Sequence, residues 1–454
     1  MTYSLLVQLP IPKLNAGVRT GNIPLASAWL KLASSDMPGE SVDILPESIA
    51  SYLGDAALIR LIAKKRPDIA GFTIYCWNVD RSIYIAQILK EIYSVKIVFG
   101  GPEVTPDNEK IQTNIVDFLV YGDGEKVFQK LISDKDIWEQ KNASQSASRF
   151  FRSSKSPYIS GLLEPEIENM ALLETQRGCP YKCGYCYYSK SRKGLAVADE
   201  DILIAAIAWA TDNKIAELFL LDPSLNTRPG LKDFLKKIGK INKDKTLSIM
   251  SEIRAEFVDH ELSGLFAQAG FSQFEIGLQS INTKALKLMN RPTDLERFVT
   301  GATLLKKQGI IPVIDLIIGL PGDDLEGFKK SVNFVADHDL ADDIQVFPLL
   351  VLPGTNYRIN SQKLGITFDS SPPYTVIETP AFPRDDILMG LDYAETVFDT
   401  VLYPQPDLEI SFRSHDSGQA EPCDHTIKLG NEMYISKLMI NRFRPIPDLE
   451  DAAV

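Results

Sequence analysis

The sequence predicts an α/β protein built from two consecutive parallel sheets, and three observations lead to this prediction. Short apolar segments of strand length alternate with helical segments along most of the 454 residues. Continuously apolar strands separated by helices are typical of parallel sheets that are covered on both faces. Glycines, prolines and polar residues gather just after several of these strands, and a serine-rich segment divides the series in two.

The first series, residues 1–140, predicts a doubly wound, Rossmann-like parallel sheet domain. The loops GGPE (100–103) and GDGE (122–125) follow two of its strands. Ligands of open parallel sheets bind outside the carboxyl ends of the strands, so these loops form a candidate binding rim. The expected strands are 5–10, 41–45, 68–75, 95–101 and 117–122, and the expected helices are 25–34, 56–65 and 82–93.

Residues 141–168 are predicted to be a linker between two domains. The stretch KNASQSASRFFRSSKSPYIS (141–160) is rich in serine and nearly free of aliphatic residues. Such a composition is typical of a linker or a surface crossing. A polar loop inside one domain is the alternative interpretation.

The second series, residues 169–364, predicts a partial (β/α)6 barrel. Six strand–helix units follow one another, which is fewer than the eight units of a closed barrel. The expected strands are 172–178, 217–222, 247–253, 273–280, 311–319 and 343–351. The expected helices are 199–211, 231–241, 259–269, 283–289, 294–308 and 324–338.

Residues 365–454 predict a small C-terminal α+β region. It contains one clear helical segment, 385–400, and one short possible strand, 408–413. We expect this region to close over the mouth of the barrel and to select the substrate, although it carries no recognisable motif.

The bulk composition excludes several classes of protein. A formal net charge of −12 argues against nucleic acid or an anionic membrane as a partner, since both would be repelled. Five cysteines, three of them clustered, do not form a disulfide framework. The first residues lack the features of a signal peptide, and the longest apolar runs are too short to span a bilayer. These observations predict a cytoplasmic protein.

The three clustered cysteines lie in RGCPYKCGYC (177–186), directly after a predicted strand. Cys179, Cys183 and Cys186 supply three thiolates, whereas a closed zinc site or an ordinary iron–sulfur cluster takes four protein ligands. Either a distant ligand completes the site, or one metal position stays open for an outside molecule. In the first case a structural zinc or cluster site would be completed by Cys76, Cys423 or a histidine.

This run resembles the CxxxCxΦC signature of the radical S-adenosylmethionine (SAM) superfamily, with Tyr185 as the aromatic residue. The resemblance implies a [4Fe–4S] cluster whose open iron binds SAM, and SAM contacts from polar residues at later strand ends. An arginine could pair with the SAM carboxylate, and a glycine allows close approach to the adenine. Strand-end caps or salt bridges are the alternative roles. The implied SAM-binding residues are Tyr185, Asp222, Ser224, Glu252, Arg254, Gln279, Ser280 and Gly319.

The first domain resembles the cobalamin-binding domain that precedes many radical SAM barrels. The segments that carry this likeness are TGNIPLASAWL (20–30), GFTIYCWN (71–78), GGPEVTP (100–106) and YGDGE (121–125). The four histidines are His260, His338, His415 and His425, so none in this domain can ligate cobalt from below. A domain that has lost its cofactor pocket is the rival interpretation. The implied cobalamin-binding residues are Asn22, Tyr75, Asn78, Gly100, Gly101, Glu103, Gly122, Gly124 and Glu125.

Together the two resemblances imply an enzyme that methylates an unactivated carbon of a natural product or peptide with the help of cobalamin. Its partners would be a small-molecule or peptide substrate and an external electron donor of the flavodoxin or ferredoxin type. Cobalamin-free radical chemistry, such as peptide epimerisation, is one alternative, and a non-catalytic cobalamin or iron–sulfur binding protein is another. Under the epimerase alternative Cys423 would return a hydrogen atom to the substrate radical. A lone cysteine is otherwise usually a small buried apolar residue.

Overall fold

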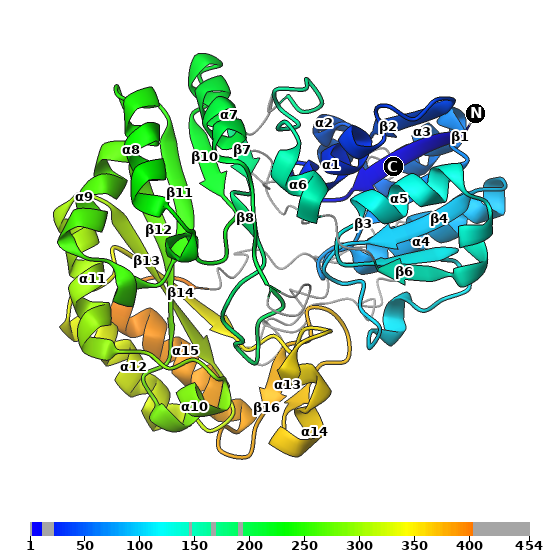
Figure 1. Ribbon diagram of the computed structural model, residues 1–454. Helices are drawn as coiled ribbons and strands as arrows, with labels where there is room; N and C mark the ends of the chain where they lie inside the picture. Colours follow the sequence, from blue (N-terminus) through cyan, green and yellow to red (C-terminus); the bar gives the residue numbers. More distant parts are fainter. Residues whose placement is uncertain (1, 11–21, 145–147, 165–168, 189–193, 403–454) are drawn as a thin grey trace, which may run out of the picture.

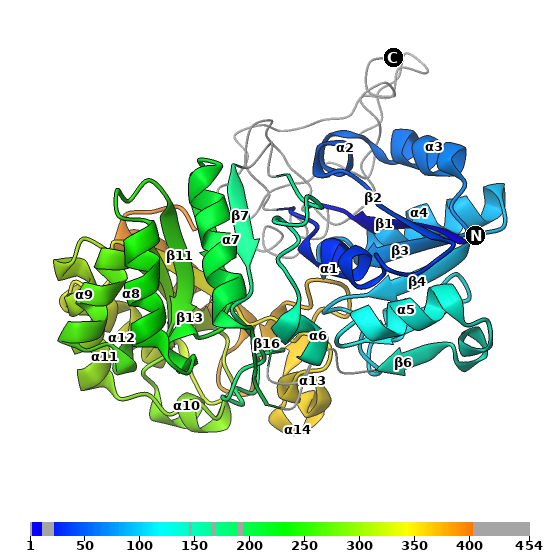
Figure 2. The same ribbon diagram turned by 45° about the horizontal axis from the view of Figure 1, so that its top comes forward.

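The computed structural model describes residues 2–10, 22–144, 148–164, 169–188 and 194–402. Two six-stranded parallel sheets dominate this part of the chain. Figure 1 shows the N-terminal sheet in blue and cyan on the right and the barrel in green and yellow on the left. Figure 2 shows from a second side that helices cover the outer face of the barrel.

The N-terminal sheet has the strand order β2-β1-β3-β4-β5-β6, and all its pairs are parallel. The order reverses between β1 and β3, and a ligand crevice is expected at the carboxyl ends of the strands at such a point. The strands are β1 (Thr2–Gln8), β2 (Glu40–Ile44), β3 (Ile69–Thr73), β4 (Lys96–Gly100), β5 (Phe118–Tyr121) and β6 (Asn142–Ser144).

Helices cover both faces of this sheet, as a doubly wound fold requires. Because strand side chains alternate, Leu5 and Val7 of β1 join one apolar core and Leu6 joins the other. The first core also contains residues of α3 and α4, and the second contains residues of α5. The helices are α1 (Leu25–Ala33), α2 (Glu47–Tyr52), α3 (Asp55–Lys65), α4 (Val79–Ile92) and α5 (Glu125–Ser133), with the 3₁₀ turns η1 (Glu109–Ile111) and η2 (Asp136–Gln140).

The predicted linker contains regular structure. Residues 142–144 form β6, which pairs with 119–121 of β5 at the edge of the sheet. A short polar edge strand has no apolar pattern, so composition could not reveal it. Helix α6 (Ser148–Ser153) follows, and its Phe151 is buried against Trp29, with ring centroids 5.9 Å apart.

The second sheet has the order β14-β13-β12-β11-β10-β7, again with every pair parallel. Within the described residues β7 and β14 do not pair, so the barrel stays open, as predicted. The strands are β7 (Met170–Leu173), β10 (Glu217–Leu220), β11 (Ser248–Ile253), β12 (Phe271–Gln279), β13 (Ile311–Ile318) and β14 (Asp343–Pro348). The helices are α7 (Glu200–Asp212), α8 (Leu231–Ile241), α9 (His260–Ala269), α10 (Thr283–Leu288), α11 (Leu295–Lys307) and α12 (Leu325–Asp337), with η3 (Leu225–Thr227) and η4 (Ala255–Phe257).

The first barrel strand is shorter than predicted. It ends at Leu173, and residues 176–177 form a separate strand, β8 (Gln176–Arg177), antiparallel to β9 (Ala196–Val197). The Asp222 carboxylate accepts hydrogen bonds from the Thr175 and Gln176 amides at 3.0 and 2.7 Å. These bonds hold the chain where it turns out of the sheet toward the cysteine loop.

The C-terminal region contains α13 (Asn356–Ile359), α14 (Ser361–Leu364), the paired strands β15 (Thr367–Phe368) and β16 (Val376–Glu378), and α15 (Arg384–Phe398). Gly390 lets α15 pack closely on the barrel, since a Cβ there would lie 3.2 Å from Phe328 of α12. Helix α15 therefore lies on the outer wall of the barrel. That residues 365–454 close over the barrel mouth stays a prediction, since 403–454 lie outside the described residues. The possible strand 408–413 lies outside the described residues. No helix of the described chain is long and apolar enough to cross a bilayer.

Candidate active site

The three motif cysteines lie together on the loop that follows β8. Cys183 is buried, and its carbonyl accepts a hydrogen bond of 3.2 Å from the Cys186 amide. Burial, and then the charges of Cys183 and Cys179, raise the pKa of Cys186 to about 12. Cys76 follows β3 in the other sheet, and its pKa is raised by burial and then by Glu103. Cys76 therefore belongs to the N-terminal domain, whereas the three motif cysteines belong to the barrel.

The loop supplies three cysteine thiols, a donor set that fits a [4Fe–4S] cluster with one iron left open. Among the described residues, no three His, Cys, Asp or Glu side chains are placed to hold one metal ion. A zinc ion would need all its sulfur ligands at about 2.3 Å from one point. A [4Fe–4S] cluster takes each cysteine at a different iron, so its thiolates need not converge on one point.

Residues from distant segments hold the cysteine loop. The Gly184 amide donates to the Met289 carbonyl at 2.8 Å, and its carbonyl accepts from the Tyr357 amide at 2.9 Å. A Cβ at Gly184 would lie 2.8 Å from the Tyr357 ring, so this position needs glycine. Arg291 lies beside the loop, with Nη1 3.8 Å from the Cys183 Sγ.

Charged side chains gather on the inner face of the barrel next to Arg291. Glu252 of β11 is the register partner of Glu275 of β12, and Asp315 of β13 pairs with Gly277. Burial, followed by the charges of Glu275 and Asp315, raises the pKa of Glu252 to about 8. Burial followed by the charge of Glu275 raises the pKa of Asp315 to about 7. Burial thus favours the protonated forms of both acids, and a nearby cation would favour their ionised forms.

Several polar atoms of this group have no partner among the described residues. They are Oε1 of Gln279, Oδ1 of Asp315 and Nε of Arg291. Buried polar atoms are nearly always hydrogen-bonded, so open ones indicate a bound molecule or water. Gln279 has a φ of +69°, and its amide lies over Gly277, where the guanidinium of Arg291 also lies. A cation, carboxyls and an amide at one point match the carboxylate, ammonium and hydroxyl groups of SAM.

Other residues implied for SAM already use their polar atoms within the protein. Besides the hydrogen bonds from two backbone amides, the Asp222 carboxylate accepts one from the Thr175 hydroxyl at 2.6 Å. Burial raises the pKa of Asp222 to about 7. Ser280 donates to Asp323 at 2.8 Å, and Ser224 donates to Asn226 at 3.0 Å. These three side chains shape the strand ends, and the sequence could not distinguish that role from ligand contact.

Arg254, Gly319 and Tyr185 also have contacts within the protein. Nη2 of Arg254 bonds Glu256 and the Pro292 carbonyl, both at 2.6 Å, which leaves Nε without a partner in the described chain. A Cβ at Gly319 would lie 2.7 Å from Val376, so this glycine (φ +81°) permits the packing of β16. Tyr185 packs against the barrel core.

The sequence analysis missed Arg291 and Asp315. Asp315 is the one charged residue in the apolar strand β13, and that contrast could have identified it. Arg291 follows α10 in a polar loop and approaches Cys183 only through the fold.

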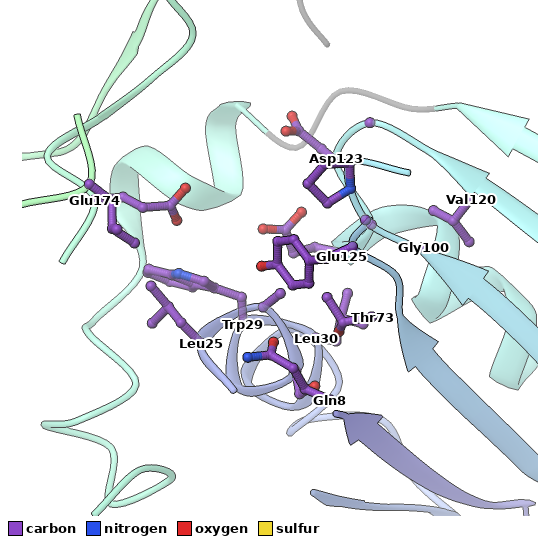
Figure 3. A pocket seen from close by; sticks show the side chains of 18 of the residues that line it. Gln8, Leu25, Trp29, Leu30, Thr73, Gly100, Val120, Asp123, Glu125 and Glu174 are labelled. Carbon is purple, nitrogen blue, oxygen red and sulfur yellow. The ribbon is translucent and has the colours of Figure 1, made fainter. Parts of the chain in front are cut away.

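A cavity of about 560 Å³ lies between the two sheets, at the reversal point between β1 and β3. In Figure 3, Glu174 from the barrel lies across the cavity from Gly100 and Val120 of the N-terminal sheet, and Trp29 from α1 forms part of its wall. Gln8 at the end of β1 also lines the cavity and donates to Asn22 Oδ1 at 3.2 Å. Such volumes are typical of small-molecule and cofactor sites.

Most residues implied for cobalamin line this cavity. They are Asn22, Tyr75, Gly100, Gly101, Gly122, Gly124 and Glu125. Asn78 and Glu103 do not line it. Asn78 holds the loop after β3 from behind, because its amide donates to the Leu9 and Thr73 carbonyls at 3.0 Å each. The sequence did not single out Gln8, Trp29, Thr73, Leu172 or Arg177, which also line the cavity.

Arg177 connects the cavity with the cysteine loop. Its Nη1 donates to the carboxylate of Glu125, the first residue of α5, at 2.6 Å, and its Nε and Nη2 donate to the Glu174 carboxylate at 2.9–3.1 Å. Its guanidinium lies over the rings of Phe151 and Trp29, at 4.4 and 5.6 Å. Burial alone would lower the pKa of Arg177, but the charges and hydrogen bonds of Glu174 and Glu125 raise it by more. The guanidinium therefore stays protonated.

Residues 354–374, here called the strap, join the N-terminal sheet to the cysteine loop. The Gly354 amide donates to Asp107 at 2.9 Å, and the Tyr374 hydroxyl donates to Glu103. Between them Tyr357 contacts Gly184. Burial raises the pKa of Glu103 to about 7, although the hydrogen bonds from Tyr374 and Asn108 act to lower it.

Comparison with known proteins agrees with this geometry. Residues 173–335 match the radical SAM superfamily, and residues 20–132 match the B12 binding domain. The chain is 24% identical over 357 residues to 2-(S-pantetheinyl)-carbapenam-3-carboxylate methyltransferase of Streptantibioticus cattleyicolor, covering 70% of this chain and 52% of that protein. It is 23% identical, with the same coverage, to the cobalamin-dependent radical SAM methyltransferase TokK of Streptomyces tokunonensis. The chain thus spans about half the length of these curated relatives.

The fold is also that of a solved structure. The radical SAM methyltransferase TsrM of Kitasatospora setae, with cobalamin and a [4Fe–4S] cluster bound, superposes with a TM-score of 0.68. The match covers 87% of this chain and 91% of that one, at 14% sequence identity. The cofactors that go with the two domains are a [4Fe–4S] cluster with SAM, and cobalamin. Residues 173–335 of this chain thus form a radical SAM domain, and residues 20–132 form a B12-binding domain that precedes it.

Proposed function

We propose that this chain is a cobalamin-dependent radical SAM methyltransferase acting on an unactivated carbon of a natural product or peptide. One observation carries the proposal: a single cavity is lined both by the loops of the B12-binding sheet and by residues on either side of the three cysteines. The latter are Leu172, Glu174, Gln176, Arg177, Gly178, Tyr187 and Tyr188. The two methyltransferases named above support it by their sequence similarity. A reducing cytoplasm is the proposed setting, because the motif needs free thiols.

In this proposal Cys179, Cys183 and Cys186 hold the cluster and leave one iron open for SAM. Arg291 pairs with the SAM carboxylate, since it is buried beside Cys183. Glu252 and Asp315 accept from the ammonium and hydroxyl groups of SAM, whose positive charge favours their ionised forms. When bound, the cofactors together supply a hydrogen-abstracting radical and the methyl group, and the protein supplies position and exclusion of water.

In this proposal cobalamin would bind in the cavity between the sheets, where the lining offers mainly backbone and apolar contacts. Gly100, Gly101, Gly122 and Gly124 leave room along its N-terminal side. The sequence of this domain contains no histidine, so none of its residues provides an imidazole to cobalt. Electron paramagnetic resonance of the cobalt(II) form should show no splitting from a histidine nitrogen, and clear nitrogen splitting would contradict the proposed mode of binding.

The reaction products test the proposed activity. A methyltransferase of this kind consumes two SAM molecules per turnover, so 5′-deoxyadenosine and S-adenosylhomocysteine should form in about equal amounts. An epimerase would form only 5′-deoxyadenosine and would place solvent deuterium on its substrate. Cys423, the hydrogen donor of that alternative, lies outside the described residues. If Cys423→Ala stops product formation, and the wild type makes no S-adenosylhomocysteine, the methyltransferase proposal is wrong.

A further inference from the structure

The cysteine loop has one side that faces solvent. Lys182 is exposed and directly precedes the buried Cys183. The Lys182 carbonyl accepts from the Asn290 side chain at 3.1 Å, and Gly184 bonds Met289. The loop therefore lies along the end of α10, which Figure 1 shows at the lower end of the barrel. The surface beside Lys182 is therefore linked to Cys183 both directly along the chain and through the hydrogen bonds to Asn290 and Met289.

This surface is basic, although the whole chain has a charge of −12. Lys182, Lys284, Lys287 and Arg297 are exposed. Within the described part of the chain, none of these four has a carboxylate at ion-pair distance. Three exposed acids lie nearby. Asp294 caps α11 by accepting from the Arg297 amide at 3.1 Å, and Asp324, two residues after Gly322 beside Lys284, caps α12 by accepting from the Gly327 amide at 2.8 Å. The third is Glu296.

Two exposed apolar side chains lie among these cations. Leu288, the last residue of α10, is 41% exposed, and Phe257 is 44% exposed. The Phe257 ring stacks on Tyr181 of the cysteine loop with centroids 6.5 Å apart, and Arg297 lies 5.9 Å over it. We call Lys182, Phe257, Lys284, Lys287, Leu288 and Arg297 the basic face.

We propose that the basic face is the docking surface for an acidic one-electron carrier protein of the flavodoxin type. The inference rests on the proposed function, since the cluster must receive one electron before SAM is cleaved. The carrier is oxidised by one electron as the cluster is reduced by one. A small apolar centre within a charged rim is typical of brief electron-transfer encounters. Because the chain as a whole repels an acidic carrier, a local group of cations determines where it docks.

The test compares two reductants in the holoenzyme. In the Lys182→Glu/Lys287→Glu variant, the flavodoxin concentration that half-saturates 5′-deoxyadenosine formation should rise roughly tenfold or more. Dithionite is small and needs no docking surface, so the dithionite-driven rate should stay within about twofold of wild type. The matched control is Lys64→Glu/Lys130→Glu, which makes the same charge change on exposed residues of the N-terminal domain. An unchanged flavodoxin response, or an equal loss in the control, would overturn the proposal.

A binding measurement separates docking from catalysis. Binding of oxidised flavodoxin to the wild-type holoenzyme should weaken as salt rises from about 50 to about 300 mM, and should be lost in the variant. Salt-independent binding contradicts the proposal. If the first variant loses its cluster spectrum, Lys284→Glu/Lys287→Glu on α10 repeats the test away from the cysteine loop. Absence of dithionite-driven SAM cleavage in the wild type would instead refute the proposed function, whatever the binding result.

Discussion

Each of the two sheets has six parallel strands and a candidate site at the carboxyl ends of these strands. The residues that line the two sites nevertheless differ in kind. The crevice of the N-terminal sheet is lined mostly by glycines and apolar side chains, and its amides Gln8 and Asn22 bond each other. The barrel mouth is lined by charged groups, and polar atoms of Arg291, Asp315 and Gln279 are left open in the described chain. The same strand arrangement thus forms an apolar cavity in one domain, where we propose that cobalamin binds, and a charged site in the other, where we propose that SAM binds.

The largest effect should come from removing a cluster ligand. Cys183→Ala should abolish the [4Fe–4S] cluster and all 5′-deoxyadenosine formation, because the two remaining thiolates cannot hold three irons. Cobalamin binding in the other sheet should persist. Iron content, visible spectra and product assays measure this, with Cys76→Ala as the control that keeps its iron. A full cluster in Cys179→Ala/Cys183→Ala/Cys186→Ala would contradict the assignment of the motif.

The converse change should damage only the other region. Gly100→Trp directs a large ring toward the cavity and should weaken cobalamin binding at least about a hundredfold through overlap with the cofactor. Cluster content and dithionite-driven SAM cleavage should stay near wild type. Gly100→Ala is the matched control, since its Cβ would lie 3.7 Å from Val120, an ordinary contact. Equal cobalamin affinity in the tryptophan variant would place the cofactor elsewhere.

A third change tests the charged site without removing the cluster. Arg291→Ala should weaken SAM binding about 10- to 100-fold, since a hydrogen bond to a charged group contributes about 1.5–3 kcal/mol. Arg291→Lys retains the charge and should recover part of the affinity. Equilibrium binding of SAM to the holoenzyme gives the numbers, and electron paramagnetic resonance confirms the cluster. SAM affinity unchanged in both variants would rule out the carboxylate contact.

The smallest effect concerns the contact between the strap and the N-terminal sheet. Burial raises the pKa of Glu103 from its ordinary value of 4.5 to about 7. The fold thus favours the protonated carboxyl: its contribution is fully present below pH 4.5 and is lost as the pH rises through about 7. Raising the pH from 5 to 8 should therefore destabilise the wild type by a few degrees in Tm more than Glu103→Gln.

Thermal unfolding at the two pH values measures this difference. The control is Glu109→Gln, since Glu109 is exposed on the same loop and should keep the wild-type pH dependence. An identical pH dependence in Glu103→Gln and wild type would show that Glu103 is not protonated in the fold.

The sequence predicted what depends on local spacing. Both parallel sheets, the open barrel and the cysteine loop follow from apolar periodicity and from one ten-residue motif. Glycine-bearing loops also predicted much of the cavity, because a loop after a parallel strand lies at a known edge of the sheet. It could not predict side-chain direction within a loop. Asn78 and Asp222 were therefore predicted as ligand contacts, whereas in the structure Asn78 donates to the Leu9 carbonyl and Asp222 accepts from the Gln176 amide.

Contacts between segments that are distant in the sequence could not be predicted either. Arg291 reaches Cys183 across 108 positions, and Glu103 meets Tyr374 across 271. Neither residue carries a local sign of its partner. Strand β6 was missed for a different reason, since a polar edge strand gains its hydrogen bonds from the neighbouring strand and needs no apolar pattern.

The strap also limits how this protein can be recombined. Asp107 and Glu103 of the N-terminal sheet bond Gly354 and Tyr374, which come more than two hundred residues later. A chimera joined at residue 144 would give the barrel a foreign loop in place of 103–108, and both bonds would be lost unless that loop carried matching acceptors. When the first domain is exchanged between relatives, the strap (354–374) must therefore be exchanged with it. Such a chimera needs two separate replaced segments rather than one.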